Sequence, residues 1–296
     1  NPYSEKEYEP SPLNRVLKQA APGNDWALGQ GHEVALEYDT NIITDNVRQF
    51  DVSLTETTTN GVMTYTAVLV EESAGLMYPA GELYKSITYD ENHDGASSRL
   101  HTTEEFKDKQ GRVVLKRTYA LVGGVEEPHD TYYVYDDFGN LTYVLPPLVE
   151  ATTSTLTEIV NDLDALGYQY VYDHRNRLVE KKVPGKGWEY IVYNALDQPI
   201  MTQDSVQRTS GEWPFTKYDA FGRVAYTGKS IELDNGNPSS RTYVQDQVDA
   251  LGGQWVSRDT GFNMDNMLVE YENTGYPATT ISEVLTVNYY DDYGFG

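Results

Sequence analysis

Apolar and polar residues alternate over short segments in the middle of the chain. Tyr168, Tyr170 and Tyr172 are separated by Gln169 and Val171, so the three rings fall on one face of an extended segment. The segment from residue 178 to 183 alternates in the same way, and a polar stretch separates the two. This pattern predicts a β-hairpin over residues 168–183.

The hairpin carries a phrase that recurs along the chain. Each copy has an aromatic residue, then Asp or Asn, then a polar turn that often contains Gly or Asn, then Arg or Gln before an apolar residue. The Asp or Asn side chain can bond to nearby backbone amides, and Gly or Asn tolerates the positive φ of a tight turn. We assign to these turns Tyr135, Asp136, Gly139, Tyr172, Asp173, Asn176, Tyr193, Asn194, Tyr218, Asp219, Gly222, Tyr290 and Asp291.

Copies of the phrase start at residues 106, 135, 172, 193, 218 and 290, so the intervals between them vary. Repeats with insertions of variable length predict an all-β fold, a stack or spiral of antiparallel hairpins. A further hairpin is expected around Asn60-Gly61. One short helix is expected near 155–166, because its apolar residues recur at helical spacing, Thr155 and Glu158 can form a capping box, and Gly167 follows its end.

The repeated phrases resemble the YD repeat of RHS proteins, large secreted or cell-surface proteins that include polymorphic toxins, insecticidal toxin-complex subunits and the teneurins. Residues 9–16, Ala21-Pro22-Gly23 with Trp26, and residues 180–185 look like the RHS proteins of Bacteroidetes in particular. The resemblance implies a spiralling β-shell that encloses a C-terminal toxin or other cargo. Asp-Pro motifs mark self-cleavage in many relatives, and this sequence contains none, so any such activity is expected beyond Gly296.

The resemblance also implies partners and a location. The partners would be the remainder of the same chain, the enclosed cargo and, for relatives in Bacteroidetes, the type IX secretion machinery. The location would be secreted or on the bacterial cell surface. We expect residues 1–128 to form an N-terminal β-meander region that leads into the shell. Residues 129–296 are expected to form a YD-repeat sheet that continues beyond residue 296.

The composition limits the functions open to the chain. The formal net charge is −24, from 46 acidic and 22 basic residues, and such a field repels phosphate backbones, so we expect no nucleic-acid binding. No apolar run is long enough to predict a membrane span. Cysteine is absent, which excludes disulfides and thiolate chemistry. With 25 Tyr against 7 Phe, much of the core must come from rings whose hydroxyls still reach water or a partner.

The sequence shows no arrangement typical of a catalytic site, and we expect no enzymatic activity, no catalytic residues and no cofactor. The one candidate for a metal is a loop in which Asp90, Asn92 and Asp94 match the first half of a calcium-binding pattern, followed by Gly95. His101 occupies the position where a bidentate Glu would belong. A solvated loop is the favoured interpretation, and calcium is the alternative.

Two functions are compatible with the sequence. The first is a non-catalytic structural segment of an RHS shell. The second is a glycan- or surface-binding adhesin module, in which Trp188 and Trp213 would stack on sugar rings beside Asp and Asn side chains. Packing on the sheet is the simpler explanation for these rings.

Overall fold

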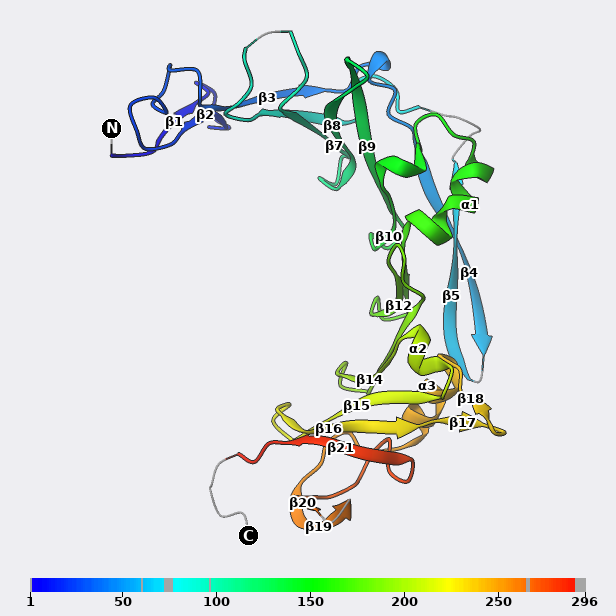
Figure 1. The fold of residues 1–296 in the computed structure, drawn as a ribbon. Helices are drawn as coiled ribbons and strands as arrows, with labels where there is room; N and C mark the ends of the chain where they lie inside the picture. The colour runs from blue at the N-terminus through cyan, green and yellow to red at the C-terminus, as the bar shows by residue number, and fades with distance from the viewer. Residues whose placement is uncertain (1, 60, 72–76, 96, 265–266, 291–296) are drawn as a thin grey trace. The chain divides into compact units, whose positions relative to one another are not determined.

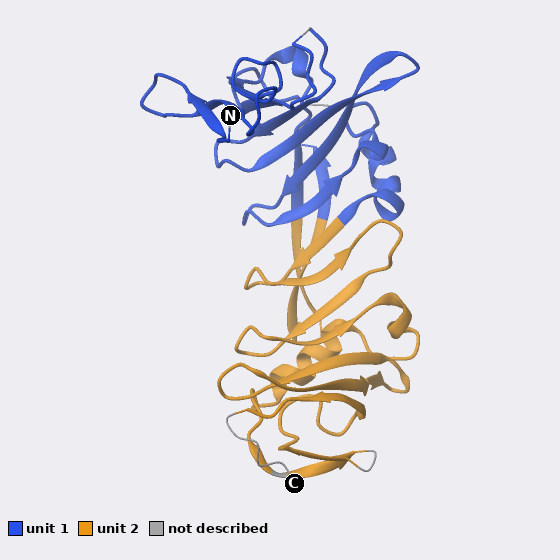
Figure 2. Ribbon diagram, turned by 60° about the vertical axis from the view of Figure 1, so that its left-hand side comes forward, with its two compact units in different colours: residues 1–53, 68–168 blue, residues 54–67, 169–296 orange. Residues whose placement is uncertain are grey.

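The computed structural model describes residues 2–59, 61–71, 77–95, 97–264 and 267–290. Their regular secondary structure is mainly antiparallel strand, with only short helices, which confirms the predicted all-β fold (Figure 1). The chain divides into two compact units (Figure 2). Unit 1 comprises residues 1–53 and 68–168, and unit 2 comprises residues 54–67 and 169–296. The boundary expected at 128/129 falls inside strand β9 (Val125–Tyr135), which pairs with the preceding strand over most of its length.

Unit 1 is built from antiparallel strands that mostly pair with their neighbours in the sequence. Strand β3 pairs instead with β6, because the β4–β5 hairpin lies between them along the chain. Burial alternates as the strand geometry requires: in β7, Thr102, Glu104 and Phe106 are buried. The strands of this sheet, besides β9, are β1 (Glu5–Tyr8), β2 (Val16–Ala20), β3 (Val34–Thr40), β6 (Tyr84–Tyr89), β7 (Thr102–Lys107), β8 (Val113–Val122) and β10 (Leu141–Leu145).

Unit 2 contains a second run of antiparallel pairs, which follows the chain from β11 to β16 and then continues to β21. The sequence between β16 and β21, residues 232–280, is an insertion into this run and is called the insertion below. The strands of the run are β11 (Tyr168–Tyr172), β12 (Leu178–Lys182), β13 (Glu189–Tyr193), β14 (Pro199–Gln203), β15 (Glu212–Tyr218), β16 (Val224–Ile231) and β21 (Ile281–Val287).

Strands β4 (Phe50–Thr59) and β5 (Val62–Glu71) form a separate two-stranded sheet, which confirms the hairpin predicted around Asn60-Gly61. Asn60 lies outside the described residues. Gly61 has φ of 77°, the left-handed conformation that a tight turn requires. The tip of this hairpin, residues 54–67, belongs to unit 2.

The described residues contain three short α-helices and two 3-10 helices, at Ile43–Asp45 and Pro147–Val149. Helix α1 (Leu156–Leu166) confirms the predicted helix, with the capping box of Thr155 and Glu158 in place. Helices α2 (Ser205–Arg208) and α3 (Arg241–Ala250) were not predicted. In α3 the buried face includes the polar Arg241 and Gln245, which hid its helical pattern.

The insertion covers one face of the unit 2 sheet. Besides α3 it holds β17 (Leu233–Asp234), β18 (Asn237–Pro238), β19 (Arg258–Met264) and β20 (Met267–Tyr271). Its buried apolar side chains join those of the sheet in one core, made of Val192, Ile200, Met201, Trp213, Phe215, Ala225 and Tyr226 from the strands and Val244, Val248, Val256, Val269 and Tyr271 from the insertion. Burial of this apolar surface is the main force that holds the insertion on the sheet.

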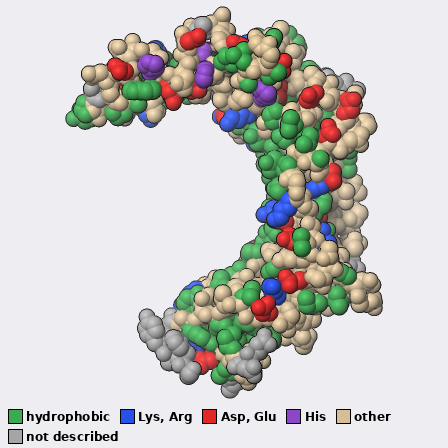
Figure 3. Space-filling model, viewed as in Figure 1, with side chains coloured by type: hydrophobic (Ala, Val, Ile, Leu, Met, Phe, Trp, Pro, Cys, Tyr) green, Lys and Arg blue, Asp and Glu red, His purple; other side chains and the backbone are tan. Residues whose placement is uncertain are grey.

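The face drawn in Figure 3 shows little segregation of acidic side chains. On the face drawn in Figure 3, acidic side chains are scattered among hydrophobic and uncharged ones. Among the described residues, no helix is long and apolar enough to cross a membrane.

Candidate functional site

Five turns of the chain share one backbone geometry, and we call them the repeat turns. They are residues 108–112, 136–140, 173–177, 194–198 and 219–223. In the turn that begins at Asp173, the N–H of Asp173 donates to the carbonyl of Arg177 at 3.0 Å, and the N–H of Asn176 donates to the carbonyl of Asp173 at 2.9 Å. The fourth residue has positive φ in all five turns, and it is Gly111, Gly139, Asn176, Asp197 or Gly222.

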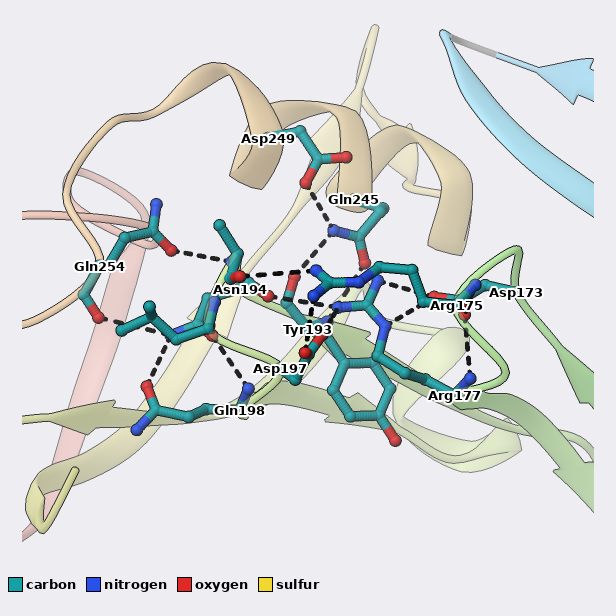
Figure 4. Close-up of polar contacts among 12 residues, drawn as sticks. Asp173, Arg175, Arg177, Tyr193, Asn194, Asp197, Gln198, Gln245, Asp249 and Gln254 are labelled. Carbon is teal, nitrogen blue, oxygen red and sulfur yellow. Dashed lines mark hydrogen bonds and ion pairs between the residues drawn. The ribbon is translucent and has the colours of Figure 1, made fainter.

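The first side chain of each repeat turn organises the backbone that follows it. In the turn of Asp173, Oδ1 accepts from the N–H groups of Arg175 (2.9 Å) and Arg177 (3.0 Å), as the close-up in Figure 4 shows in part. Asp108, Asp136, Asn194 and Asp219 make the same pair of contacts to the third and fifth residues of their turns. These bonds close the turn from within.

The fifth residue of the turn binds the second side-chain oxygen of the first. Arg112, Arg177 and Arg223 each place Nε at 2.7 Å from Oδ2 of the Asp four residues earlier. Burial alone would raise the pKa of Asp219, but the hydrogen bonds from Arg223 and from backbone amides outweigh it and lower that pKa. These carboxylates are engaged by their own turns, so they serve as structural groups.

Several hairpins are joined to an earlier one by a tyrosine at or near the end of a strand. The hydroxyl of Tyr193 donates to the carbonyl of Leu178 (2.9 Å), the residue that follows Arg177, and the guanidinium of Arg177 lies 4.8 Å from the centre of the Tyr193 ring. We call this pair of contacts the Arg–Tyr interlock. It recurs where Arg112 meets Tyr135 and Arg223 meets Tyr290, with hydroxyl bonds to Val113 (3.0 Å) and Val224 (3.1 Å).

A further Arg–Tyr interlock was not predicted from the sequence. Arg15 lies 4.4 Å from the ring of Tyr38, and the Tyr38 hydroxyl donates to the carbonyl of Val16 at 3.0 Å. Glu9 replaces the Asp of the other turns, and it accepts from Arg15 Nε at 2.9 Å across a longer loop. The signal was present in the order Tyr, acidic residue, Arg and Val from residue 8 to 16, but the longer loop and the Glu concealed it.

The predicted turn residues lie where the repeat geometry places them. Tyr135, Tyr193, Tyr218 and Tyr290 each donate a hydroxyl hydrogen bond to the carbonyl after an earlier turn. Tyr172 ends β11 and directly precedes the turn of Asp173. Asp291 lies outside the described residues.

The predicted calcium loop folds as a variant of the repeat turn. The N–H of Asp90 donates to the carbonyl of His101 at 2.9 Å, and Asp90 Oδ1 accepts from the N–H of Asn92 at 2.8 Å. His101 takes positive φ, and its Nδ1 lies 3.4 Å from Asp90 Oδ2. Asp94 lines a groove beside this loop. In the part of the chain that the structure describes, no three His, Asp or Glu side chains are grouped to hold a metal ion.

The two tryptophans assigned to glycan contact lie in different settings. Trp213 is fully buried in β15, at 0% exposure, and packs beside Tyr190 at 6.5 Å between ring centres. Its indole therefore belongs to the core and presents no surface to a sugar, because its position in the strand faces the insertion. Trp188 is half-buried, and its carbonyl accepts from Arg208 at 2.7 Å.

A row of buried charges in unit 1 was not predicted. Arg117 binds both oxygens of Asp130, at 2.6 and 2.8 Å, and its cross-strand neighbour on the other side is Glu104. Lys85 binds Asp45 at 2.9 Å and lies 3.2 Å from Glu104. Burial would lower the pKa of Arg117, but the hydrogen bond and charge of Asp130 raise it above its ordinary value. The sequence feature that could have indicated this row is the presence of charged residues at alternating positions of the strands.

Comparisons with known proteins give a family match at one end of the chain and distant structural neighbours. A domain of unknown function (DUF6443) matches residues 1–40. Among curated proteins, none matches. The Tc holotoxin pore of Photorhabdus luminescens, with the TccC3 mutation D651A, is similar at a TM-score of 0.44 and 13% identity, over 78% of this chain and 9% of that chain.

The crystal structure of TcdB2-TccC3 is similar at a TM-score of 0.42 and 14% identity, over 77% of this chain and 10% of that chain. The crystal structure of TcdB2-TccC3 without the hypervariable C-terminal region is similar at a TM-score of 0.41 and 13% identity, over 82% of this chain and 11% of that chain. The present chain therefore spans about a tenth of the length of these solved chains.

Proposed function

We propose that this chain is a non-catalytic structural segment of a large secreted or cell-surface bacterial RHS-repeat protein. In this role it forms part of a β-shell around a C-terminal toxin or other cargo. The observation that supports the proposal best is the Arg–Tyr interlock, which joins neighbouring hairpins at four places along the chain. A shell built from repeats is held together by contacts between neighbouring repeats.

The polar groups of the turns also favour a structural role over a catalytic one. The Asp and Asn side chains that recur in the sequence are engaged by the backbone of their own turns. A general acid or a nucleophile needs a side chain that can reach a substrate. We therefore place any enzymatic activity in a segment other than residues 1–296.

The proposed partners are the remainder of the same polypeptide, the enclosed cargo and, during export, the type IX secretion machinery. The test uses the native polypeptide that contains residues 1–296. Its intact mass should be far above 33.4 kDa, and a cargo segment should resist protease until the shell is denatured. A mature polypeptide near this mass, or a cargo segment digested at the rate of an unfolded control, would refute the proposal.

A second candidate function, binding of an uncharged glycan, is favoured by one hollow in unit 1. The hollow measures about 220 Å³, and the residues that line it include the aromatic Phe50 and Tyr133 and the charged Arg48, Asp51 and Arg112. Aromatic faces beside fixed polar groups suit the apolar and hydroxyl faces of a sugar ring.

The charges around the hollow favour a neutral ligand over an ion. Arg48 is paired with Glu71, and Arg112 is paired with Asp108 at 2.7 Å. Because both arginines are already neutralised, an anion gains little from either of them. The ion pairs also fix the orientation of the guanidinium groups, which prepares them to bind hydroxyls.

Titration with a panel of monosaccharides, followed by NMR, tests this candidate. We expect millimolar binding that Tyr133→Ala weakens at least about tenfold, which corresponds to the loss of one stacked ring. Tyr84→Ala, at a ring that is 61% exposed on β6, is the matched control and should leave binding unchanged. No shift with any sugar of the panel would remove the candidate.

A further inference from the structure

One repeat turn departs from the common pattern at three positions. The other turns of unit 2 begin with Asp and end with Arg, and an aliphatic residue follows. The turn 194–198 begins with Asn194 and ends with Gln198, and Pro199 follows. The geometry of the turn is nevertheless retained, because Asn194 Oδ1 accepts from the N–H groups of Leu196 and Gln198 at 3.0 Å each.

The first departure is matched by Gln254 of the insertion, and the second is matched by the amide of Asn194. Asn194 Nδ2 donates to Gln198 Oε1 at 2.8 Å and lies 3.4 Å from the carbonyl of Gln254. The side chain of Gln254 accepts from the N–H of Ala195 at 2.9 Å. An Asp at position 194 would have no N–H to offer, and it would place a carboxylate oxygen against the carbonyl of Gln254.

The third departure is matched by Gln245, on the buried face of α3. Pro199 lies opposite Tyr193 in the β13–β14 pair and has no N–H, so it cannot donate to its neighbour as other residues of the ladder do. The side chain of Gln245 accepts from the Tyr193 N–H at 3.1 Å and donates to the Tyr193 carbonyl at 2.8 Å. Asp249 holds this amide in orientation, at 3.0 Å (Figure 4).

We propose that the turn 194–198 is a docking site for the insertion, and that Asn194, Gln198 and Pro199 are the residues that make it specific. The apolar core drives the insertion onto the sheet but is non-directional. Gln245 and Gln254 bind this particular turn and the strand residue before it. They therefore fix the position along the sheet at which α3 and the loop after it pack. The partner that fits this surface is an amide-bearing segment, and here the same chain supplies it.

The proposal can be tested by giving the turn 194–198 the Asp and Arg of the other turns in unit 2. The turns 173–177 and 219–223 show that a turn with these residues folds in this sheet. The variant Asn194→Asp with Gln198→Arg and Pro199→Val should keep its hairpin and lose the docking contacts. Hydrogen exchange followed by mass spectrometry should show amides of residues 241–256 exchanging about five to thirty times faster, the equivalent of one or two lost hydrogen bonds. The amides of β15 should stay protected, as should those of β13 other than Tyr193, whose N–H donates to Gln245.

Two further variants and a control complete the experiment. Gln245→Ala and Gln254→Ala leave the sequence of the turn unchanged and should give the same increase in exchange rate over residues 241–256. They therefore test the proposal even if the triple variant unfolds the sheet. Asn140→Arg makes the corresponding change in a turn of unit 1 and should leave exchange in residues 241–256 unaltered. Unchanged exchange there in both glutamine variants would overturn the proposal, because apolar packing and the other polar contacts of the insertion, such as Arg241 with Glu180, would then hold it without the turn.

Discussion

The Arg–Tyr interlock makes a quantitative prediction for the pair Arg177 and Tyr193. The guanidinium lies 4.8 Å from the ring centre, and the Arg177 side chain is 15% exposed. A cation over a ring contributes about 0.5–1 kcal/mol at exposed sites and about 2 kcal/mol when desolvated. We therefore expect a coupling free energy of about 1 kcal/mol between the two side chains.

A double-mutant cycle with Arg177→Met and Tyr193→Leu isolates this coupling from the ion pairs of Arg177 and from the hydroxyl bond of Tyr193. Urea unfolding is followed by tryptophan fluorescence in a Trp26→Phe background, because the remaining tryptophans, Trp188, Trp213 and Trp255, all lie in unit 2. The single substitutions lower the free energy of unfolding by unequal amounts, and the cycle removes these contributions.

The chain offers a matched control in which the cation is naturally missing. Tyr218 donates to the carbonyl of Pro199 at 2.9 Å, as Tyr193 does to its own partner, but the residue before that carbonyl is Gln198. A cycle with Gln198→Met and Tyr218→Leu should therefore give coupling close to zero. Additivity within about 0.3 kcal/mol at Arg177 and Tyr193, or equal coupling in both cycles, would refute the electrostatic account of the interlock.

Three further substitutions test the packing, the buried amine and the buried ion pair. Gly228→Ala places a methyl group against the carbonyl of Glu283 and should lower the free energy of unfolding by about 3 kcal/mol in urea titration, whereas Gly252→Ala, in open space, should not. Burial lowers the pKa of Lys217 to about 7. The unfolded lysine keeps its proton to about pH 10, so stability should rise with pH between these values, and Lys217→Met should flatten that part of the profile. Asp130→Asn removes the charge opposite buried Arg117 and should cost about 3 kcal/mol in thermal unfolding, while an unchanged melting temperature would contradict the ion pair.

The repeat turns could be predicted from sequence because their geometry is local. The Asp173 side chain bonds to amides two and four residues later, and positive φ falls on a residue type that accepts it, Asn176. The capped helix α1 was predictable for the same reason, since Thr155 and Glu158 satisfy each other across one turn. In each case the interacting groups are within four residues, so the spacing in the sequence determines the contact.

The contacts that escaped prediction connect residues that are distant in the sequence. Gln245 and Tyr193 are 52 residues apart, and nothing in the local pattern of α3 points to a strand carbonyl. Glu104, Arg117 and Asp130 come together only through strand register, which a shift of one residue would destroy. The core position of Trp213 likewise depends on the insertion that covers it, so its sequence context left sugar contact open beside the favoured packing on the sheet.

The interlock also explains how the repeat tolerates unequal intervals. The hydroxyl bond from Tyr193 to Leu178 spans 15 residues, and the bond from Tyr290 to Val224 spans 66, yet the two measure 2.9 and 3.1 Å. Lengthening a closed loop by this factor costs only about 1.3 kcal/mol of chain entropy. The apolar core that the insertion shares with the sheet buries far more than enough surface to offset this cost. Insertions between repeats are therefore compatible with an unbroken ladder, provided that the Tyr of one repeat still reaches the carbonyl after an earlier turn.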